Sequence, residues 1–121
     1  MNNTSHLMCQ KFLEALHNYA PSYKSVVGVD WIGESQYYDG SAALQAELVW
    51  DDGFPETSTL SVNLSQYGFV TPPGYAVIRN YSEHEGLPDA LEAAGVATKE
   101  EEVSIGFGSG WLMKIITTPD S

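Results

Sequence analysis

Apolar and polar residues alternate between positions 43 and 51, and this alternation constrains the fold more than any other feature of the sequence. Successive side chains of a strand point to opposite faces, so the pattern predicts a half-buried antiparallel strand. The turn residues Asp51-Asp52-Gly53 follow it, and Pro55 lies just beyond them. A second alternation over residues 59–65 therefore predicts that the two segments form a hairpin with a longer loop.

Two helices, one long and one short, are predicted from the spacing of apolar residues. The segment Asn3–Tyr19 has the periodicity of one amphipathic helix, and Pro21 ends it. A short helix is expected to begin at Leu87, because Pro88 is tolerated in a first helical turn, and to stop at Gly95.

The β-branched and aromatic composition of strands is found in four further segments, at residues 25–32, 75–81, 103–107 and 111–117. Residues 33–40 are predicted to form a turn or loop, and Gly108-Ser109-Gly110 a hairpin turn. The element order predicts an α+β fold, in which a mostly antiparallel sheet of about five to six strands carries both helices packed on one face. The chain of 121 residues is expected to form one domain, residues 1–121.

The charge of the chain is strongly unbalanced, since 16 acidic residues face 5 Lys and Arg, which gives a formal net charge of −11. The hydrophobic content of 43% is high enough for the chain to fold. A folded acidic protein repels nucleic acid and attracts basic surfaces over about 8–10 Å. We therefore predict a basic protein as the partner, with no direct binding of nucleic acid. The alternative is that the acidity serves only solubility.

Catalytic and metal sites have no recognisable pattern here. Cys9 has no Cys-x-x-Cys partner, no Gly-x-Ser-x-Gly motif is present, and the histidines at 6, 17 and 84 are scattered. We therefore predict no catalytic residue, no cofactor and no metal. The cluster Glu83-His84-Glu85 leaves a small hydrolase as a third interpretation of the chain.

The sequence shows no secretion or membrane-insertion pattern. A basic-then-apolar signal peptide is missing, and no apolar run approaches the roughly 18–20 residues of a membrane span. A single cysteine excludes an internal disulfide and fits a reducing compartment. A cytoplasmic location and no membrane partner are expected.

Carboxylates gather around the first predicted strands, where aromatic residues also occur. Two carboxylates two positions apart on a strand are about 6.6–6.8 Å apart, which approximates alternate phosphates along one DNA strand. Exposed aromatic residues nearby are typical anchors of protein interfaces. The candidate partner-binding residues are Asp30, Glu34, Tyr37, Tyr38, Glu47, Asp51, Asp52 and Glu56. The alternative is an ordinary solvated sheet face. A second acidic run, Glu100-Glu101-Glu102, is predicted to be an exposed loop.

The segment Tyr81-Ser82-Glu83-His84-Glu85-Gly86 lies within residues 79–96, and Ser104-Ile105-Gly106-Phe107 follows it. These residues resemble a block found in a family of small, functionally unassigned proteins of phages, plasmids and other mobile elements, which pairs a Tyr-Ser-Glu-x-Glu-Gly run with a short helix and a closing strand. The resemblance covers roughly the C-terminal third of the chain. It implies a genetic context and assigns no catalytic residue.

Small acidic proteins of mobile elements often resemble inhibitors of host defence, including anti-CRISPR and anti-restriction proteins. The resemblance and the charge together lead us to expect a non-enzymatic anti-CRISPR protein in a bacterial host cell, whose acidic surface binds a basic nucleic-acid-binding subunit. The alternative is a plasmid or phage accessory protein that binds a protein partner in transfer, replication or toxin neutralisation.

Overall fold

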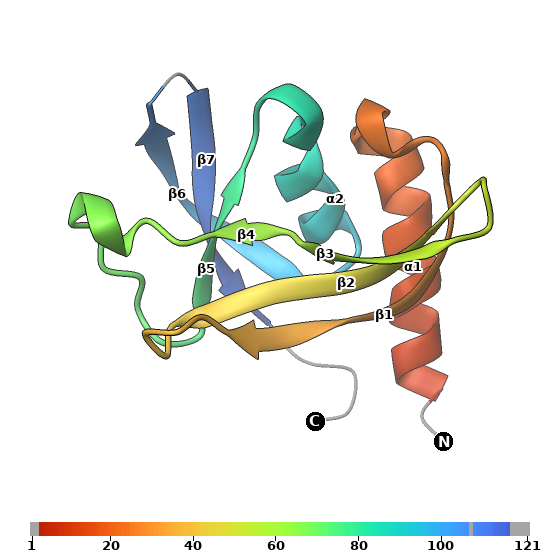
Figure 1. Cartoon of the computed structure of the whole chain (residues 1–121), viewed down its shortest axis with the longest axis horizontal. Coiled ribbons are helices and arrows are strands. Elements are labelled where there is room, and N and C mark those ends of the chain that lie inside the picture. The colour runs from red at the N-terminus through yellow and green to blue at the C-terminus, as the bar shows by residue number, and fades with distance from the viewer. Residues whose placement is uncertain (1–2, 107, 117–121) are drawn as a thin grey trace.

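Two antiparallel sheets and two α-helices make up the computed structural model, which describes residues 3–106 and 108–116, with side chains from residue 7 onward (Figure 1). The elements in chain order are α1 Asn3–Tyr19, η1 Pro21–Tyr23, β1 Val26–Gln36, β2 Ala42–Trp50, β3 Pro55–Thr59, β4 Ser61–Val62, η2 Ser65–Tyr67, β5 Tyr75–Arg79, η3 Ser82–His84, α2 Leu87–Ala93, β6 Ala97–Ile105 and β7 Gly108–Ile115, where η denotes a 3₁₀ turn. The predicted α+β class is confirmed.

The strands divide into a three-stranded sheet, β1-β2-β3, and a four-stranded sheet, β4-β5-β7-β6, so the described residues hold seven strands where about five to six in one sheet were predicted. The predicted strand over residues 43–51 is confirmed, because Leu44, Ala46 and Leu48 are buried in β2. Its predicted hairpin partner is wrong in part. The strand that pairs with β2 is β3, and after Leu60 the chain passes into β4 of the other sheet, where Ser61 lies opposite Ile78.

The predicted loop over residues 33–40 is shorter than expected, since β1 continues to Gln36 and pairs there with Ala42. Gly33 looked like a turn residue but lies inside the strand. A Cβ atom at this position would lie 2.7 Å from Cζ2 of Trp31, so the glycine lets the indole ring lie across the strand.

Two segments near the C-terminus were also predicted wrongly. The run Glu100-Glu101-Glu102 is part of β6 rather than a loop, and Gly108-Ser109-Gly110 opens β7 rather than forming a turn. Gly110 is required by close packing, because an added Cβ would lie 2.7 Å from the carbonyl oxygen of Ile78. Phe107 and Thr117, the predicted ends of two strands, lie outside the described residues.

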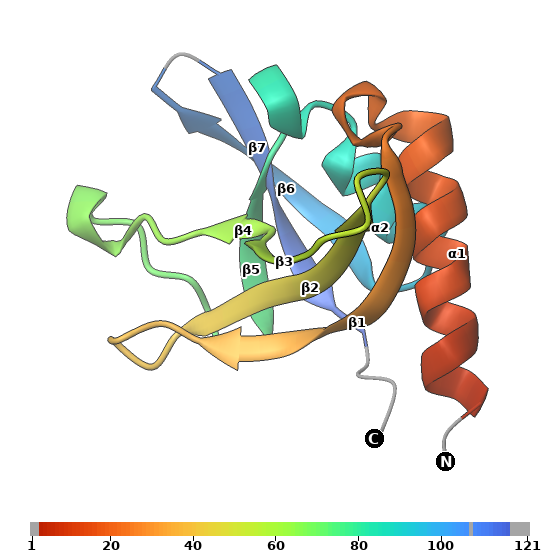
Figure 2. The same ribbon diagram turned by 45° about the vertical axis from the view of Figure 1, so that its right-hand side comes forward.

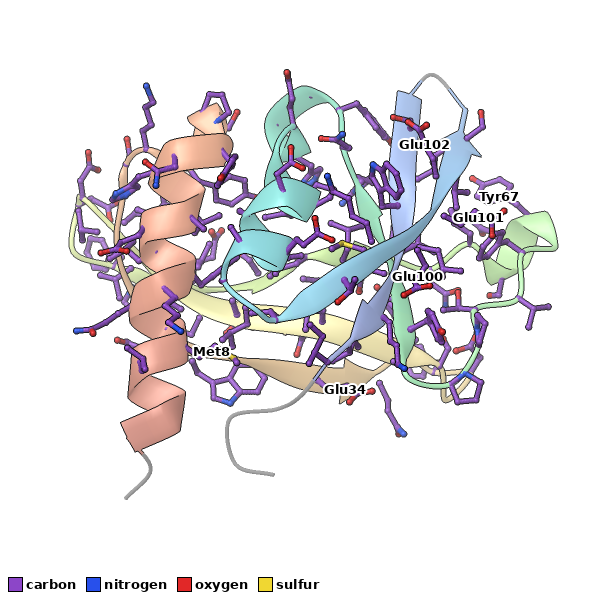
Figure 3. The ribbon with its side chains drawn as sticks, turned by 180° about the vertical axis from the view of Figure 1, so that it is seen from behind. Met8, Glu34, Tyr67, Glu100, Glu101 and Glu102 are labelled. Atoms are coloured by element: carbon purple, nitrogen blue, oxygen red, sulfur yellow. The ribbon has the colours of Figure 1, made fainter. Side chains whose placement is uncertain are left out.

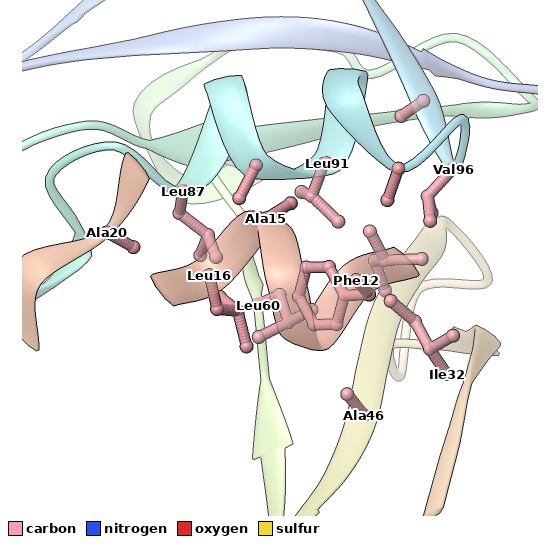
Figure 4. Close-up of a cluster of buried hydrophobic side chains, with 14 of the residues drawn as sticks. Phe12, Ala15, Leu16, Ala20, Ile32, Ala46, Leu60, Leu87, Leu91 and Val96 are labelled. Atoms are coloured by element: carbon pink, nitrogen blue, oxygen red, sulfur yellow. The ribbon is translucent and has the colours of Figure 1, made fainter. Parts of the chain in front are cut away.

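The main core lies where α1, α2 and the two sheets meet. Figures 1 and 2 show α2 between α1 and the four-stranded sheet, while α1 lies along the curved sheet β1-β2-β3. Phe12 and Leu16 of α1 reach Leu87 and Leu91 of α2, and all four side chains are fully buried (Figure 4). A smaller cluster of Leu64, Val77 and Leu112 covers the other face of the four-stranded sheet.

Candidate protein-binding site

Most carboxylates within residues 7–106 and 108–116 have no lysine or arginine in contact. Among the side chains described, Lys99 and Asp89 form the only contact between a lysine or arginine and a carboxylate. Lys99 also lies 5.2 Å from the centre of the Trp111 ring, a cation–π arrangement. The excess acidity of the sequence is therefore carried by carboxylates that no lysine or arginine of the described chain neutralises.

The eight predicted partner-binding residues lie at separate places on the sheet β1-β2-β3. Asp51, Asp52 and Glu56 lie at the β2–β3 end, and Glu34, Tyr37 and Tyr38 at the β1–β2 end. The nine residues of β2 separate these ends by roughly 25 Å at about 3.3 Å per residue. The structure therefore brings three of the eight together at each end and does not join them into one surface.

Glu47 and Asp30 belong to neither end. Glu47 lies on the outer face of the sheet, since its neighbours Ala46 and Leu48 point into the core. Asp30 lies at an irregularity of β1 beside α1. Burial, and then the Asp30 carboxylate, raise the pKa of the Cys9 thiol in that helix.

Tyr37 and Tyr38 are neighbours in sequence but differ in role. The Tyr37 hydroxyl is half-buried and lies 2.8 Å from Oγ of Ser61, which also accepts a hydrogen bond of 3.0 Å from the backbone N–H of Leu44. Burial raises the pKa of the Tyr37 phenol. Tyr38 is fully exposed at the tip of the β1–β2 hairpin. Tyr37 therefore joins the hairpin to β4, and Tyr38 is the exposed aromatic of this end.

Asp39 holds the β1–β2 turn against the segment that precedes η2, across a cleft of about 1000 Å³ that Glu34 also lines. Its carboxylate accepts hydrogen bonds from the Ser41 hydroxyl at 2.6 Å, the Ser41 backbone N–H at 3.0 Å and the Asn63 side chain at 3.3 Å. The bonds from Ser41 are the main reason that the pKa of Asp39 is lowered to about 2.

Replacing Asp39 with Ala is expected to lower the free energy of unfolding at neutral pH and to have no effect in strong acid. The folded-state pKa of about 2 lies below the value of about 3.9 for Asp in an unfolded chain. The stabilisation is therefore complete above about pH 4 and is lost as the pH falls through about 2. Urea unfolding of the wild type and Asp39→Ala across this range measures the difference.

The matched control for this prediction is Asp51→Ala, which also removes one carboxylate from a turn of the same sheet. It should change stability little at any pH, because no hydrogen bond to the Asp51 side chain is found within the described residues. A stability difference between the wild type and Asp39→Ala that persists below about pH 2 would show that the ionised Asp39 carboxylate is not the source of the stabilisation.

The β2–β3 end brings carboxylates and aromatic side chains together. We define the acidic corner as Asp51, Asp52, Glu56 and Glu83. Two adjoining clefts meet there and share Trp50 and Glu56 as lining residues. One cleft is lined also by Asp52 and the highly exposed Phe54, and the other by Glu83. The corner thus combines unneutralised carboxylates with an exposed aromatic ring.

Trp50 fixes the geometry of this corner. Its ring stacks on Tyr23 of η1, with centroids 6.1 Å apart and an interplanar angle of 25°. Its indole N–H donates a hydrogen bond of 3.0 Å to Oε1 of Glu56. Glu56 is therefore oriented by a neighbouring aromatic residue, although the carboxylate remains exposed.

The sequence predictions placed Glu83 and His84 in a possible hydrolase cluster and missed their position at the acidic corner. Nδ1 of His84 lies 3.3 Å from the Tyr23 hydroxyl, and its Nε2 lies 4.0 Å from the Glu83 carboxylate. Burial, helped by the Arg79 charge, lowers the pKa of His84, while burial and Glu83 raise the pKa of Tyr23. The contact between Tyr23 and His84 therefore links η1 to η3 beside the corner.

Close packing explains the local path of η3. Ser82 has a left-handed backbone with φ of 56°, and the Tyr81 ring lies where a Cβ of Gly108 would be. Asn80 Oδ1 accepts a hydrogen bond of 2.8 Å from the backbone N–H of Gly86. The segment is thus fixed at both ends, which sets Glu83 beside β3.

Glu100, Glu101 and Glu102 lie along β6, at the edge of the four-stranded sheet (Figure 3). A register shift between Lys99 and Glu101 interrupts the pairing of β6 with β7. Charged side chains and bulges protect a sheet edge against pairing with another strand. The acidic run therefore has a structural explanation independent of partner binding.

No family model, curated protein or solved structure matches the chain. No helix within residues 3–106 and 108–116 is long and apolar enough to cross a membrane. The same residues contain no group of three or more His, Cys, Asp and Glu side chains that could hold a metal ion. His17 instead donates a hydrogen bond of 2.6 Å to the Val26 carbonyl, and the side chain of His6 lies outside the described part.

Proposed function

We propose that this protein is a non-enzymatic inhibitor of a bacterial host defence system, an anti-CRISPR protein that binds a basic nucleic-acid-binding subunit through the acidic corner. The observation that carries the proposal is the corner itself, where Asp52, Glu56 and Glu83 line the clefts together with Trp50 and the exposed Phe54, and where no lysine or arginine lines either cleft. The site of action is then the cytoplasm of the host.

The mechanism is electrostatic competition for a basic surface. The carboxylates of the corner attract lysine and arginine side chains that otherwise bind phosphates, and complementary charge speeds the diffusional encounter. Phe54 supplies apolar area that is desolvated on contact, as aromatic residues do at the centres of protein interfaces. Once the basic surface is covered, nucleic acid is blocked or displaced.

The resemblance to mobile-element proteins supports the same proposal. The resembling run Tyr81-Ser82-Glu83-His84-Glu85-Gly86 supplies Glu83, which lines a cleft of the acidic corner together with Glu56 of β3. The accessory-protein interpretation uses the same acidic surface. It differs in the identity of the bound protein, which would be a relaxase, a replication protein or a toxin.

Capture from host lysate at low and high salt tests the proposal. We expect tagged protein to retain a CRISPR subunit at low salt and to release it as salt rises, since exposed charge pairs are screened. A relaxase, replication protein or toxin in its place would support the accessory function. Enzymatic turnover, abolished by His84→Ala, would contradict both.

Neutralising the corner is expected to slow association with the captured protein about tenfold at low salt and to flatten its salt dependence. The variant is Asp51→Asn, Asp52→Asn and Glu56→Gln combined, which keeps the side-chain oxygens that accept from Phe54 N–H and Trp50 Nε1. The matched control replaces Glu100, Glu101 and Glu102 with Gln, which removes the same charge from the β6 edge. Equal slowing by both variants would show that only net charge matters.

A further inference from the structure

The cleft between η3 and β3 has features that a general acidic surface lacks. It measures about 370 Å³ and is lined by residues of η1, β2, β3 and η3, among them Tyr23, Trp50, Glu56, Thr57, Glu83 and His84. This volume is near the lower end of the range for binding pockets and is sufficient for one side chain. The cleft is thus an open depression at the corner that is large enough for one side chain.

Two aromatic residues, Trp50 and Tyr23, line the cleft. Trp50 and Tyr23 stack on each other, and the hydrogen bond from Trp50 Nε1 to Glu56 holds the indole in place. A cation over the face of a tryptophan is attracted by the ring quadrupole, and this attraction is strongest for tryptophan among the aromatic side chains.

The charges that line the cleft also favour a cation. Glu56 and Glu83 come from different elements, and the Glu83 side chain is 74% exposed and therefore accessible to a partner. Burial and Arg79 lower the pKa of His84, so this residue adds little positive charge at neutral pH. Arg79 acts on Tyr23 and His84 from outside the cleft lining. The charged residues that line the cleft are therefore the two carboxylates, and Arg79 lies outside the lining.

We infer that this cleft receives an arginine side chain of the basic protein that the acidic corner binds, an inference that rests on the proposed function. Arginine fits better than lysine, because its planar guanidinium stacks on an aromatic ring and donates hydrogen bonds to carboxylates on two sides at once.

Titration with N-acetyl-arginine amide tests this inference without the protein partner. We expect a saturable change in the NMR signal of the Trp50 indole N–H, and a smaller one with the lysine derivative. Citrulline amide has nearly the same shape without the charge and should give no saturable change. Glu83→Gln should weaken the arginine derivative about three- to fivefold, and Glu56→Gln combined with Glu83→Gln should remove saturation. Glu102→Gln, on the β6 edge, should leave the titration unchanged.

Two results would overturn the inference: an equal response to citrulline amide, or an arginine titration that Glu83→Gln leaves unchanged. Failure of the proposed function gives a different result. In that case the arginine derivative still binds, while no basic protein is captured or the triple variant of the corner associates at the wild-type rate. Conversely, slow association of the triple variant together with no arginine binding in the cleft would support the proposed function and contradict the arginine inference.

Discussion

Gly86→Ala is expected to destabilise the protein by roughly 3–5 kcal/mol, the sum of a strained backbone and an overpacked contact. Gly86 precedes α2 with φ of 85°, in the left-handed region that favours glycine. An added Cβ would collide with the carbonyl oxygen of Tyr19 and lie 2.6 Å from its carbonyl carbon. Both obstacles are backbone, so relief requires α1 and α2 to move apart.

Gly95→Ala is the matched control, because Gly95 lies beyond the other end of the same helix with φ of 78° and no atom within 4 Å of an added Cβ. Gly95→Ala introduces backbone strain without a steric contact, and we expect it to lower the free energy of unfolding by about 1 kcal/mol. Urea unfolding of both variants measures the difference. Equal losses would show that contact with Tyr19 is not the cause.

Phe12→Ala should cost a similar amount, about 3–5 kcal/mol, through the lost burial of the ring and the cavity that remains. Phe12 is 0% exposed and lies in the core beside Leu16, among side chains from both sheets and α2 (Figure 4). The side chains around Phe12 come from several helices and strands. Movement of any one of these elements would therefore not fill the cavity left by the ring. Thermal or urea unfolding gives the change in stability.

Leu7→Ala is the control for this prediction, since Leu7 lies on the same helix and is 50% exposed. Its truncation should cost less than about 1 kcal/mol, in keeping with the smaller area removed from water. A loss from Phe12→Ala no larger than that from Leu7→Ala would mean that α1 does not pack as described.

The sequence patterns predicted the half-buried β2 and both helices because these elements bury one face only. They did not predict β3, whose residues are mostly exposed on both sides and lack an apolar face. They also joined Leu60, Val62 and Leu64 into one strand, although Leu60 fills the main core and Leu64 the smaller cluster. Periodicity does not show which sheet a buried residue faces.

The candidate site could be predicted only where its residues are neighbours in sequence. Asp51, Asp52 and Glu56 stand out as carboxylates around one turn. Tyr23 and Glu83 join them through tertiary contacts between segments far apart in the chain, and no local pattern marks such contacts. Gly33 was predicted to lie in a turn or loop for a similar reason. Glycine is required both in many turns and where a side chain packs closely on the backbone, and the sequence does not distinguish the two cases.

A single residue, Leu60, separates β3 of one sheet from β4 of the other. It is buried, and its backbone N–H donates to the Leu44 carbonyl at 2.8 Å. A connection so short and so well anchored limits the movement of β3 relative to β4. The walls of the cleft between η3 and β3 come from the two halves of the molecule and are therefore preorganised. Little conformational entropy is lost in ordering them when a partner binds.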